Sequence, residues 1–416
     1  MIRLSNIRLE SHDGWSRLCC DLSSVRWGSA SMYFELPDQY ASYFSCETYD
    51  CFLAAILFPA MYYHEDIEIC GAVSKKLFRN ITPYVQAVLK DFCADARPVS
   101  ITAQRLTIAQ QRGNLVATGF SGGVDSFATF YDYFERESDP EYKINALFFF
   151  NVGSHGPFCG PDSYRKFLAR YEYLKTVPEE KGLPFIPLNS NVHLFHAEFG
   201  HQKTDCITQA CAVLAVETAV SRYYVSSAIS YKNAMLFGST YRNFDMAAFS
   251  ESYLLPLLST EHCALIPDGE QYTRCEKTQR IADYPAARQY LNVCVSAEQK
   301  TAGNCSRCPK CLRTLLALES LGDLEEFSAV FDMREYKKHA FRYKCQERLR
   351  YRTNPLAKDN VDFARAHGNP IPNICTALIV CLPHMAFSLV KKTARVLLGD
   401  ACWQKLKRKV KHAQAA

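Results

Sequence analysis

The sequence predicts an α/β fold built on a parallel sheet with helices on both faces. Three observations support this. Short apolar runs typical of strands alternate with helical patterns from about residue 112 to 238. These runs are apolar on both faces, as in a sheet that helices cover on each side. A Ser/Gly turn follows the first run, where the carboxyl end of a strand would lie and where such sheets bind ligands.

Four parts are expected along the chain, and each has its own pattern. The first, 1–110, is a smaller α+β module that we expect to act as a lid, a dimer surface or a substrate-shaping module. Its expected strands and helices are Ser31–Leu36, Asp50–Tyr63, Ile67–Ile69 and Ser74–Phe92. The second, 111–260, holds the parallel sheet, with expected strands Leu115–Phe120, Ile144–Phe150, Pro184–Asn189 and Ala234–Gly238 and helices Ser126–Phe134, Ser163–Leu174 and Thr204–Tyr223. The others are a cysteine-bearing helical segment, 261–330, and a basic helical extension, 331–416.

Composition is ordinary for a globular enzyme. The chain has 416 residues, of which 48% are hydrophobic and 22% charged, which indicates two or three domains and excludes a disordered or fibrous protein. The formal charge of +5 is concentrated near the end, since Lys391–Lys411 holds eight Lys or Arg against one Asp. No signal peptide or spanning segment is recognised early in the chain. The expected location is therefore cytoplasmic, with most of the 19 cysteines reduced and a subset binding metal.

The segment Ser121-Gly122-Gly123-Val124-Asp125-Ser126 is the main candidate for a nucleotide site. Its glycines let the backbone approach an anion, and free N–H groups at the start of the next helix favour phosphate. The two serines add hydroxyl donors, and Asp125 is assigned to Mg²⁺ because it would otherwise repel phosphate. No Lys follows the glycines, so this is not a Walker-type loop. The alternative is an ordinary N-capped Ser/Gly turn.

Ser-Gly-Gly-x-Asp-Ser after a strand resembles the PP-loop (N-type) ATP pyrophosphatases, which include asparagine, GMP and NAD synthetases, tRNA thiolation enzymes and cyanodeazaguanine synthases. The resemblance implies an adenine nucleotide alpha hydrolase-like fold. It also implies that ATP is cleaved between its α and β phosphates, that a substrate oxygen is adenylylated, and that AMP is then displaced by ammonia or sulfur. Adenine would lie near Gly119, Phe120 and Asn151.

A second motif contains three cysteines at two-residue gaps, Cys305, Cys308 and Cys311, with Cys294 upstream. Four thiolates at this spacing can close a tetrahedral Zn²⁺ site. Cys275 is the rival fourth ligand. An iron–sulfur cluster and plain reduced cysteines on a helix are the alternatives.

The cysteines narrow the resemblance to the 7-cyano-7-deazaguanine synthase-like branch, in which a similar cysteine series and then an Arg follow the PP-loop domain. Here Arg313 follows the series, and Pro256, Arg274 and Lys277 match an upstream Pro-Leu segment and basic residues. The likeness covers about 115–325. The gap after Cys294 is longer than in that branch, and 241–245 lacks its acidic and Tyr-rich pattern, so the deazaguanine substrate is not carried over.

Further residues are candidates for the reaction. Arg274 and Lys277 would share a helix face and neutralise charge on phosphate or a carboxylate, although a solvated face is the alternative. Ser239, Thr240 and Arg242 follow an expected strand and are candidate substrate contacts.

The basic C-terminal extension has two possible partners. Arg334–Arg352 interleaves eight basic residues with aromatic ones, which suits RNA, although a helix packing its aromatics inward explains it as well. The tail after Lys391 could contact an anionic membrane surface.

These observations predict an ATP-dependent C–N ligase that adenylylates a small-molecule carboxylate or amide for attack by ammonia from solution or a partner, giving an amide or nitrile. ATP, Mg²⁺ and a structural Zn²⁺ are the expected cofactors. The alternatives are an RNA-thiolating PP-loop enzyme and a catalytically silent nucleotide-binding component of a multi-protein system. A homodimer is one expected assembly.

Overall fold

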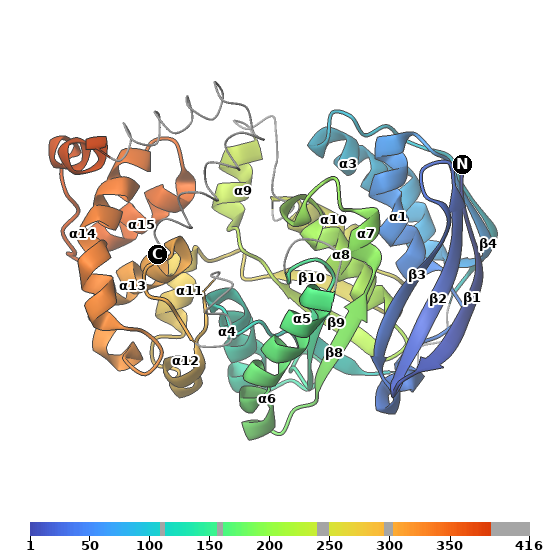
Figure 1. Cartoon of the computed structure of the whole chain (residues 1–416), viewed down its shortest axis with the longest axis horizontal. Helices are drawn as coiled ribbons and strands as arrows, with labels where there is room; N and C mark the ends of the chain where they lie inside the picture. Colours follow the sequence, from blue (N-terminus) through green and yellow to red (C-terminus); the bar gives the residue numbers. More distant parts are fainter. Residues whose placement is uncertain (109–112, 156–160, 239–248, 295–302, 384–416) are drawn as a thin grey trace, which may run out of the picture. The chain divides into compact units, whose positions relative to one another are not determined.

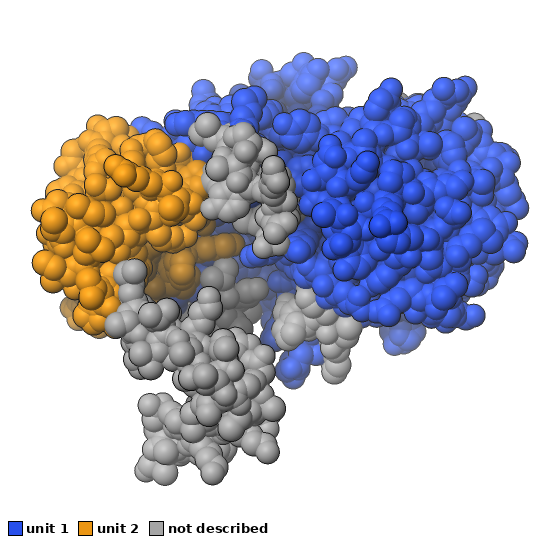
Figure 2. Space-filling view, turned by 90° about the horizontal axis from the view of Figure 1, so that it is seen from above, with its two compact units in different colours: residues 1–305, 326–331 blue, residues 306–325, 332–416 orange. Residues whose placement is uncertain are grey.

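The computed structural model describes residues 1–108, 113–155, 161–238, 249–294 and 303–383. The chain divides into two compact units, the first made of residues 1–305 and 326–331 and the second of residues 306–325 and 332–416 (Figure 2).

A ten-stranded mixed sheet forms the centre of the first unit (Figure 1). Its order is β10-β9-β6-β7-β8-β3-β2-β1-β4-β5. The strands are β1 (Ile2–His12), β2 (Trp15–Ser24), β3 (Gly28–Pro37), β4 (Ile67–Ser74), β5 (Ile101–Thr107), β6 (Leu115–Gly119), β7 (Ala146–Asn151), β8 (Phe185–Ser190), β9 (Val220–Ser226) and β10 (Ala264–Asp268).

Helices connect and cover these strands. In the first unit they are α1 (Asp50–Tyr63), α2 (Lys75–Asn80), α3 (Gln86–Phe92), α4 (Val124–Phe130), α5 (Pro161–Leu174), α6 (Thr176–Glu180), α7 (Val192–Phe195), α8 (His201–Ala215), α9 (Tyr231–Gly238), α10 (Glu251–Leu257), α11 (Arg274–Arg280) and α12 (Pro285–Tyr290). A 3₁₀ turn follows β3 at Asp38–Tyr43, and π-helical turns continue α2 at Ile81–Val85 and α4 at Tyr131–Arg136.

The predicted α/β class is confirmed, but the sheet is only partly parallel. Strands β10, β9, β6, β7 and β8 are parallel to their neighbours. Strand β3 joins β8 in antiparallel fashion and leads into the antiparallel β3-β2-β1 set, after which β4 and β5 are again parallel. The segment expected to be a separate α+β module therefore extends the same sheet.

The parallel half has a topological switch point. In chain order its strands β6 to β10 are first to fifth, so their spatial order is 3-2-1-4-5, that of doubly wound sheets. The connection reverses between β6 and β9, and the carboxyl ends of these two strands flank the crevice where such sheets bind ligands. The Ser121 turn leaves the sheet at this point.

Both faces of the parallel half are covered by helices. Phe148 on β7 belongs to one hydrophobic core with residues of α1 and α8. Its neighbour Phe149 points the other way, since its ring stacks on Phe167 of α5 at 5.4 Å between centroids. Adjacent residues of a strand face opposite sides of a sheet, so α1 with α8 and α5 lie on opposite faces.

Two sequence predictions were wrong near the end of this half. The expected helix Thr204–Tyr223 ends at Ala215, and Val220–Ser226 is strand β9. The run Ala234–Gly238, expected to be the fourth strand, belongs to helix α9 instead. A short apolar run does not distinguish helix from strand, whereas the Val and Tyr residues of β9 favour a strand.

The second unit is helical in its described part. It contains α13 (Pro309–Leu321), α14 (Met333–Arg350) and α15 (Pro355–Ala366), and Leu324–Phe327 is a short 3₁₀ turn at its boundary. Tyr336 and Tyr343 of α14 are buried, and Lys344 pairs with Glu319 of α13 at 2.9 Å. Two aromatics of the basic segment thus pack inward. Among the described helices, none has the length and hydropathy needed to cross a membrane. The basic tail after Lys391 lies outside the described residues.

Candidate functional site

The Ser/Gly loop has the geometry that its sequence predicts. It connects β6 to α4, and Gly122 adopts a φ of +72°, which strongly favours glycine. A Cβ on Gly122 would lie 2.7 Å from Cδ2 of Leu174, so a larger residue would not fit without displacing that side chain. The Ser126 hydroxyl donates to the Gly123 carbonyl at 3.1 Å and lies 3.2 Å from the Ser121 hydroxyl.

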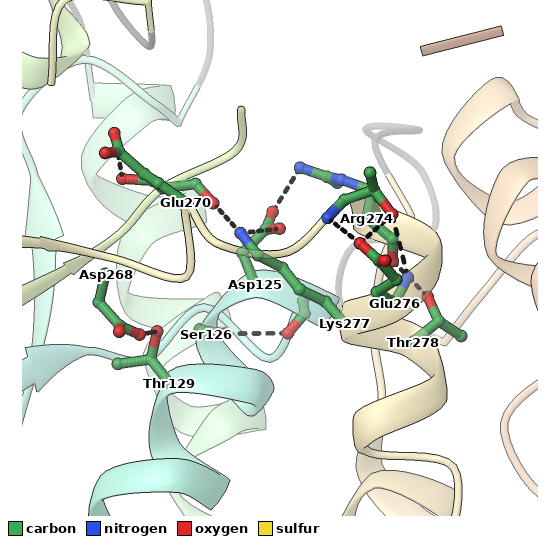
Figure 3. Close-up of polar contacts among 12 residues, drawn as sticks. Asp125, Ser126, Thr129, Asp268, Glu270, Arg274, Glu276, Lys277 and Thr278 are labelled. Atoms are coloured by element: carbon green, nitrogen blue, oxygen red, sulfur yellow. Dashed lines mark hydrogen bonds and ion pairs between the residues drawn. The ribbon is translucent and has the colours of Figure 1, made fainter. Parts of the chain in front are cut away.

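Two cationic side chains converge on the carboxylate of Asp125. Arg274 forms an ion pair with one carboxylate oxygen, and Lys277 Nζ lies 3.5 Å from the other (Figure 3). Both belong to α11, so the expectation that they share a helix face is confirmed. The carboxylate and both cations are largely withdrawn from water, with 18%, 13% and 2% of their side chains exposed.

Helix α11 begins with a capping box that sets the position of both cations. Thr273 accepts from the backbone N–H of Glu276, and the Glu276 side chain accepts from the backbone N–H of Thr273. Arg274 and Lys277 then fall in the first helical turn, three residues apart. Gly269 adopts a φ of +79°, and a Cβ there would lie 2.8 Å from the Lys277 side chain, so this glycine leaves room for the lysine.

Lys277 links the two strands of the switch point. Besides its contact with Asp125, which follows β6, its ammonium group donates to the carbonyl of Ser227, which follows β9. The carboxyl ends of the strands on both sides of the crevice thus contact one buried cation. This is the position at which a doubly wound sheet would meet the charged part of a ligand.

Acidic groups lie behind the lysine. Ser227 Oγ donates to Glu270 at 3.3 Å, and Ser252 donates to the same carboxylate at 2.6 Å. Burial raises the pKa of Glu270 and also raises the pKa of Glu251 to about 8. Because its pKa is about 8, the Glu251 carboxyl is mostly neutral near pH 7 and does not compete with Asp125 for Lys277.

Several buried polar atoms near the loop have no hydrogen-bond partner among the described residues. They are Nε of Arg274 and both side-chain atoms of Asn292. Asn292 is 2% exposed, and its backbone N–H donates to the Gly122 carbonyl at 2.7 Å. Unpaired buried polar groups are costly, and a bound polar ligand is one way to satisfy them. The two donors among these atoms, Nε of Arg274 and Nδ2 of Asn292, fit an anion at this loop.

The other predicted nucleotide residues fall into two groups. Gly119 ends β6, where a Cβ would lie 2.9 Å from the Tyr223 hydroxyl, so the strand needs glycine there. The side chains of Phe120 and Val124 are 1% exposed and are core residues, so only their backbone can contact a ligand. Asn151 ends β7 and donates to Asn189 at 2.6 Å.

The predicted substrate contacts Ser239, Thr240 and Arg242 lie outside the described residues. Their prediction depended on a strand at Ala234–Gly238, which is a helix. The carboxyl end of the fourth parallel strand is instead at Ser226, and Ser227 is the residue that follows it. No other observation now supports those three residues.

The four predicted metal ligands come together. The Sγ atoms of Cys294, Cys305, Cys308 and Cys311 all lie within 4.8 Å of one another, and those of Cys308 and Cys311 are 3.5 Å apart. Tetrahedral Zn–S bonds of about 2.3 Å place the sulfurs about 3.8 Å apart, so a small adjustment closes the site. Cys275 lies in α11 and is not in the group. The cluster can hold a metal ion such as zinc.

Sequence reasoning missed Arg170. This side chain is 7% exposed and donates to the Ser121 carbonyl at 3.0 Å, and burial lowers its pKa to about 10. It takes a position on the apolar stripe of α5 formed by Phe167, Tyr171 and Leu174. The sequence signal for this residue was an arginine on an apolar helical stripe. It lies four residues before Leu174, the leucine beside the glycine loop.

The site thus combines a glycine loop at the switch point, a buried carboxylate with two cations, and a third cation bound to the loop backbone. No protein-family model, no curated protein and no solved structure matches this chain.

Proposed function

We propose that this protein binds ATP at the Ser121–Ser126 loop and uses it to adenylylate a small-molecule carboxylate or amide. The observation that carries the proposal is the convergence of Arg274 and Lys277 on Asp125 at the switch point between β6 and β9. A triphosphate needs several cationic groups in a water-poor site, and a carboxylate there could hold a divalent cation that would neutralise phosphate charge.

The proposed roles follow from where each group lies. The loop amides and the hydroxyls of Ser121 and Ser126 hold the β and γ phosphates. Arg274 and Lys277 stabilise negative charge that develops as the bond between the α and β phosphates breaks. Mg²⁺, when held by Asp125, supplies further charge neutralisation on the phosphates. The chain therefore contributes positioning and electrostatics, which is what phosphoryl chemistry mostly requires.

The reaction is balanced in two steps. An oxygen of the acceptor attacks the α phosphorus, forming an acceptor–AMP ester and releasing pyrophosphate. When the acceptor is a carboxylate, ammonia then attacks the carbonyl carbon of that ester, AMP leaves with the bonding electrons, and one proton goes to solvent, which gives an amide. When the acceptor is an amide, no ammonia is added: the adenylylated amide loses AMP with the bonding electrons and gives two protons to solvent, so its own nitrogen becomes the nitrile nitrogen. The cysteine cluster takes a structural part, since four thiolates leave no open position on zinc.

The test is incubation of the protein with α-labelled ATP, Mg²⁺, ammonium and a metabolite extract, followed by separation of AMP, ADP and pyrophosphate. AMP and pyrophosphate that form only with extract support adenylylation. Asp125→Asn should abolish them. Arg280→Met is the matched control, because Arg280 pairs with Asp132 between the same helices without touching the loop. ADP as the sole product would refute the proposal, and ATP binding without turnover would favour the silent nucleotide-binding alternative.

A further inference from the structure

A cavity of about 590 Å³ opens beside the carboxyl ends of β7 and β8, and the antiparallel strands β1–β3 form its other wall. Asn151 and Asn189 line it from the parallel half, and Arg17 and Glu35 line it from the antiparallel half. All belong to the first unit. The cavity is the place where the N-terminal strands meet the edge of the sheet that carries the loop.

A row of paired residues crosses this cavity from strand to strand. In the sheet register Asn151 is opposite Asn189, Asn189 is opposite Glu35, and Glu35 is opposite Arg17. Directly paired residues have side chains on the same face. The four side chains also bond in that order, because Asn151 donates to Asn189 at 2.6 Å, Asn189 donates to Glu35 at 2.5 Å, and Arg17 donates to Glu35 at 2.6 Å.

This row fixes the orientation of both amides. Glu35 forms an ion pair with Arg17, and the carboxylate of an ion pair only accepts hydrogen bonds. Asn189 must therefore direct its NH₂ group at Glu35 and its oxygen at Asn151. Asn151 must in turn direct its NH₂ group at Asn189, which leaves its Oδ1 as the free end. That oxygen is buried, has no hydrogen-bond partner among the described residues, and belongs to a side chain 2% exposed in the cavity wall.

The other lining groups define the kind of molecule that fits. Trp15, Tyr33 and Tyr164 supply aromatic surface, with the ring of Trp15 6.3 Å from that of Tyr164. The guanidinium of Arg17 is already paired with Glu35 and lies 4.0 Å over the Tyr33 ring. Arg17, the arginine among the described lining residues, is thus neutralised, so the cavity is poorly suited to a phosphate or carboxylate, and aromatic walls suit a planar ring.

From these groups we propose that the cavity binds a neutral, planar molecule that donates an N–H hydrogen bond to Asn151 Oδ1, such as an aromatic carboxamide or an amino-substituted nitrogen heterocycle. Its role as the acceptor that is adenylylated rests on the proposed function, whereas the binding itself does not. As the acceptor, the molecule must also carry the oxygen that is adenylylated, so in that role it is a neutral amide and not a free acid. The N-terminal strands would then form part of the substrate site and determine its shape.

The test measures binding without ATP by saturation-transfer NMR and titration. The probes are nicotinamide and 1-methylcytosine, each with its N,N-dimethylated counterpart, which keeps the ring and lacks the N–H donor. We expect each parent probe to bind at least 10-fold more tightly than its counterpart, about the value of one buried hydrogen bond. Equal affinities, or no binding at millimolar concentration, overturn the proposal.

A pair of variants tests the residue itself. Asn151→Ala should lose at least 10-fold in affinity for the parent probes and leave the weak binding of the dimethylated ones unchanged. Asn80→Ala, which replaces an asparagine outside the cavity, should change neither. If Asn151→Ala does not fold, the affinities of the natural chain for the parent and dimethylated probes still test the proposed hydrogen bond.

Competition with ATP separates the two proposals. If ATP competes with the probes, the cavity binds the nucleotide and the acceptor role is overturned. If the probes bind but no AMP forms, the cavity is still a binding site and the result counts against adenylylation.

Discussion

Asp125 and Lys277 lie 152 positions apart in the sequence, yet the lysine ammonium is 3.5 Å from the carboxylate and is almost completely buried. The same ammonium donates to the carbonyl of Ser227 at the end of the neighbouring strand. A buried charge is tolerated where it is paired and hydrogen-bonded, and both conditions are met here.

Replacement of Lys277 by Met should lower the rate of AMP formation by about 100-fold or more, because one of the two cations at Asp125 is lost. The effect is expected on kcat more than on KM if the lysine acts in the transition state. Steady-state kinetics of Lys277→Met against Arg280→Met measures the difference. A variant as active as the control would remove Lys277 from the site.

Replacement of Gly122 by Ala should abolish nucleotide binding and lower the free energy of unfolding by more than the same change at Gly182. Both glycines have a positive φ, which costs an alanine about 1 kcal/mol. Only at Gly122 would the new Cβ meet a neighbour, at 2.7 Å from Leu174, whereas nothing lies within 4 Å at Gly182. Urea unfolding and nucleotide titration of both variants give the comparison. If both variants lose the same free energy of unfolding, Leu174 moves away from the new Cβ without a cost in stability.

The purified protein should contain one zinc ion per chain, and Cys308→Ser should contain far less. Loss of one thiolate opens the tetrahedral site and should lower the melting temperature, as should a strong chelator. Cys46→Ser is the control, since Cys46 is exposed and outside the cluster. Metal content is measured by mass spectrometry. Iron in place of zinc, with visible absorbance, would favour the cluster alternative.

Stability should depend on the ionisation of Glu251. Burial raises its folded-state pKa to about 8, above the ordinary value of 4.5, so folding favours the protonated acid. The stabilisation is complete below about pH 4.5 and is lost as the pH rises through 8, at no more than about 1.4 kcal/mol per pH unit. Relative to Glu251→Gln, the natural chain should thus become less stable from pH 5 to pH 8. Urea unfolding of both proteins at several pH values tests this, and a constant difference would contradict it.

The sequence predicts the local parts of this structure well and its long-range pairings poorly. The glycine loop, the shared helix face of Arg274 and Lys277, and the cysteine series are each encoded by short spacings, and all three form where those spacings indicate. The pairing of β3 with β8 depends on two short runs far apart in the chain, and no local pattern specifies it.

The buried polar residues of the site were harder to predict from the sequence. Arg170 and Asn292 contact the loop backbone from elements that follow other strands, so they become recognisable only when the sheet is assembled. The mistaken strand at Ala234–Gly238 shows the same limit. A five-residue apolar run fits both the helical and the strand periodicity, so its tertiary contacts determine which structure it forms.

The joint between β3 and β8 also determines when during biosynthesis the cavity can exist. Glu35 and Asn189 are 154 positions apart, so at about 5–20 residues per second the ribosome adds Asn189 roughly 8–30 s after Glu35. Until then the edge of β3 has no partner and is open to pairing with another nascent chain. A chain that stops before β8 keeps that exposed edge, so we expect early termination products to aggregate.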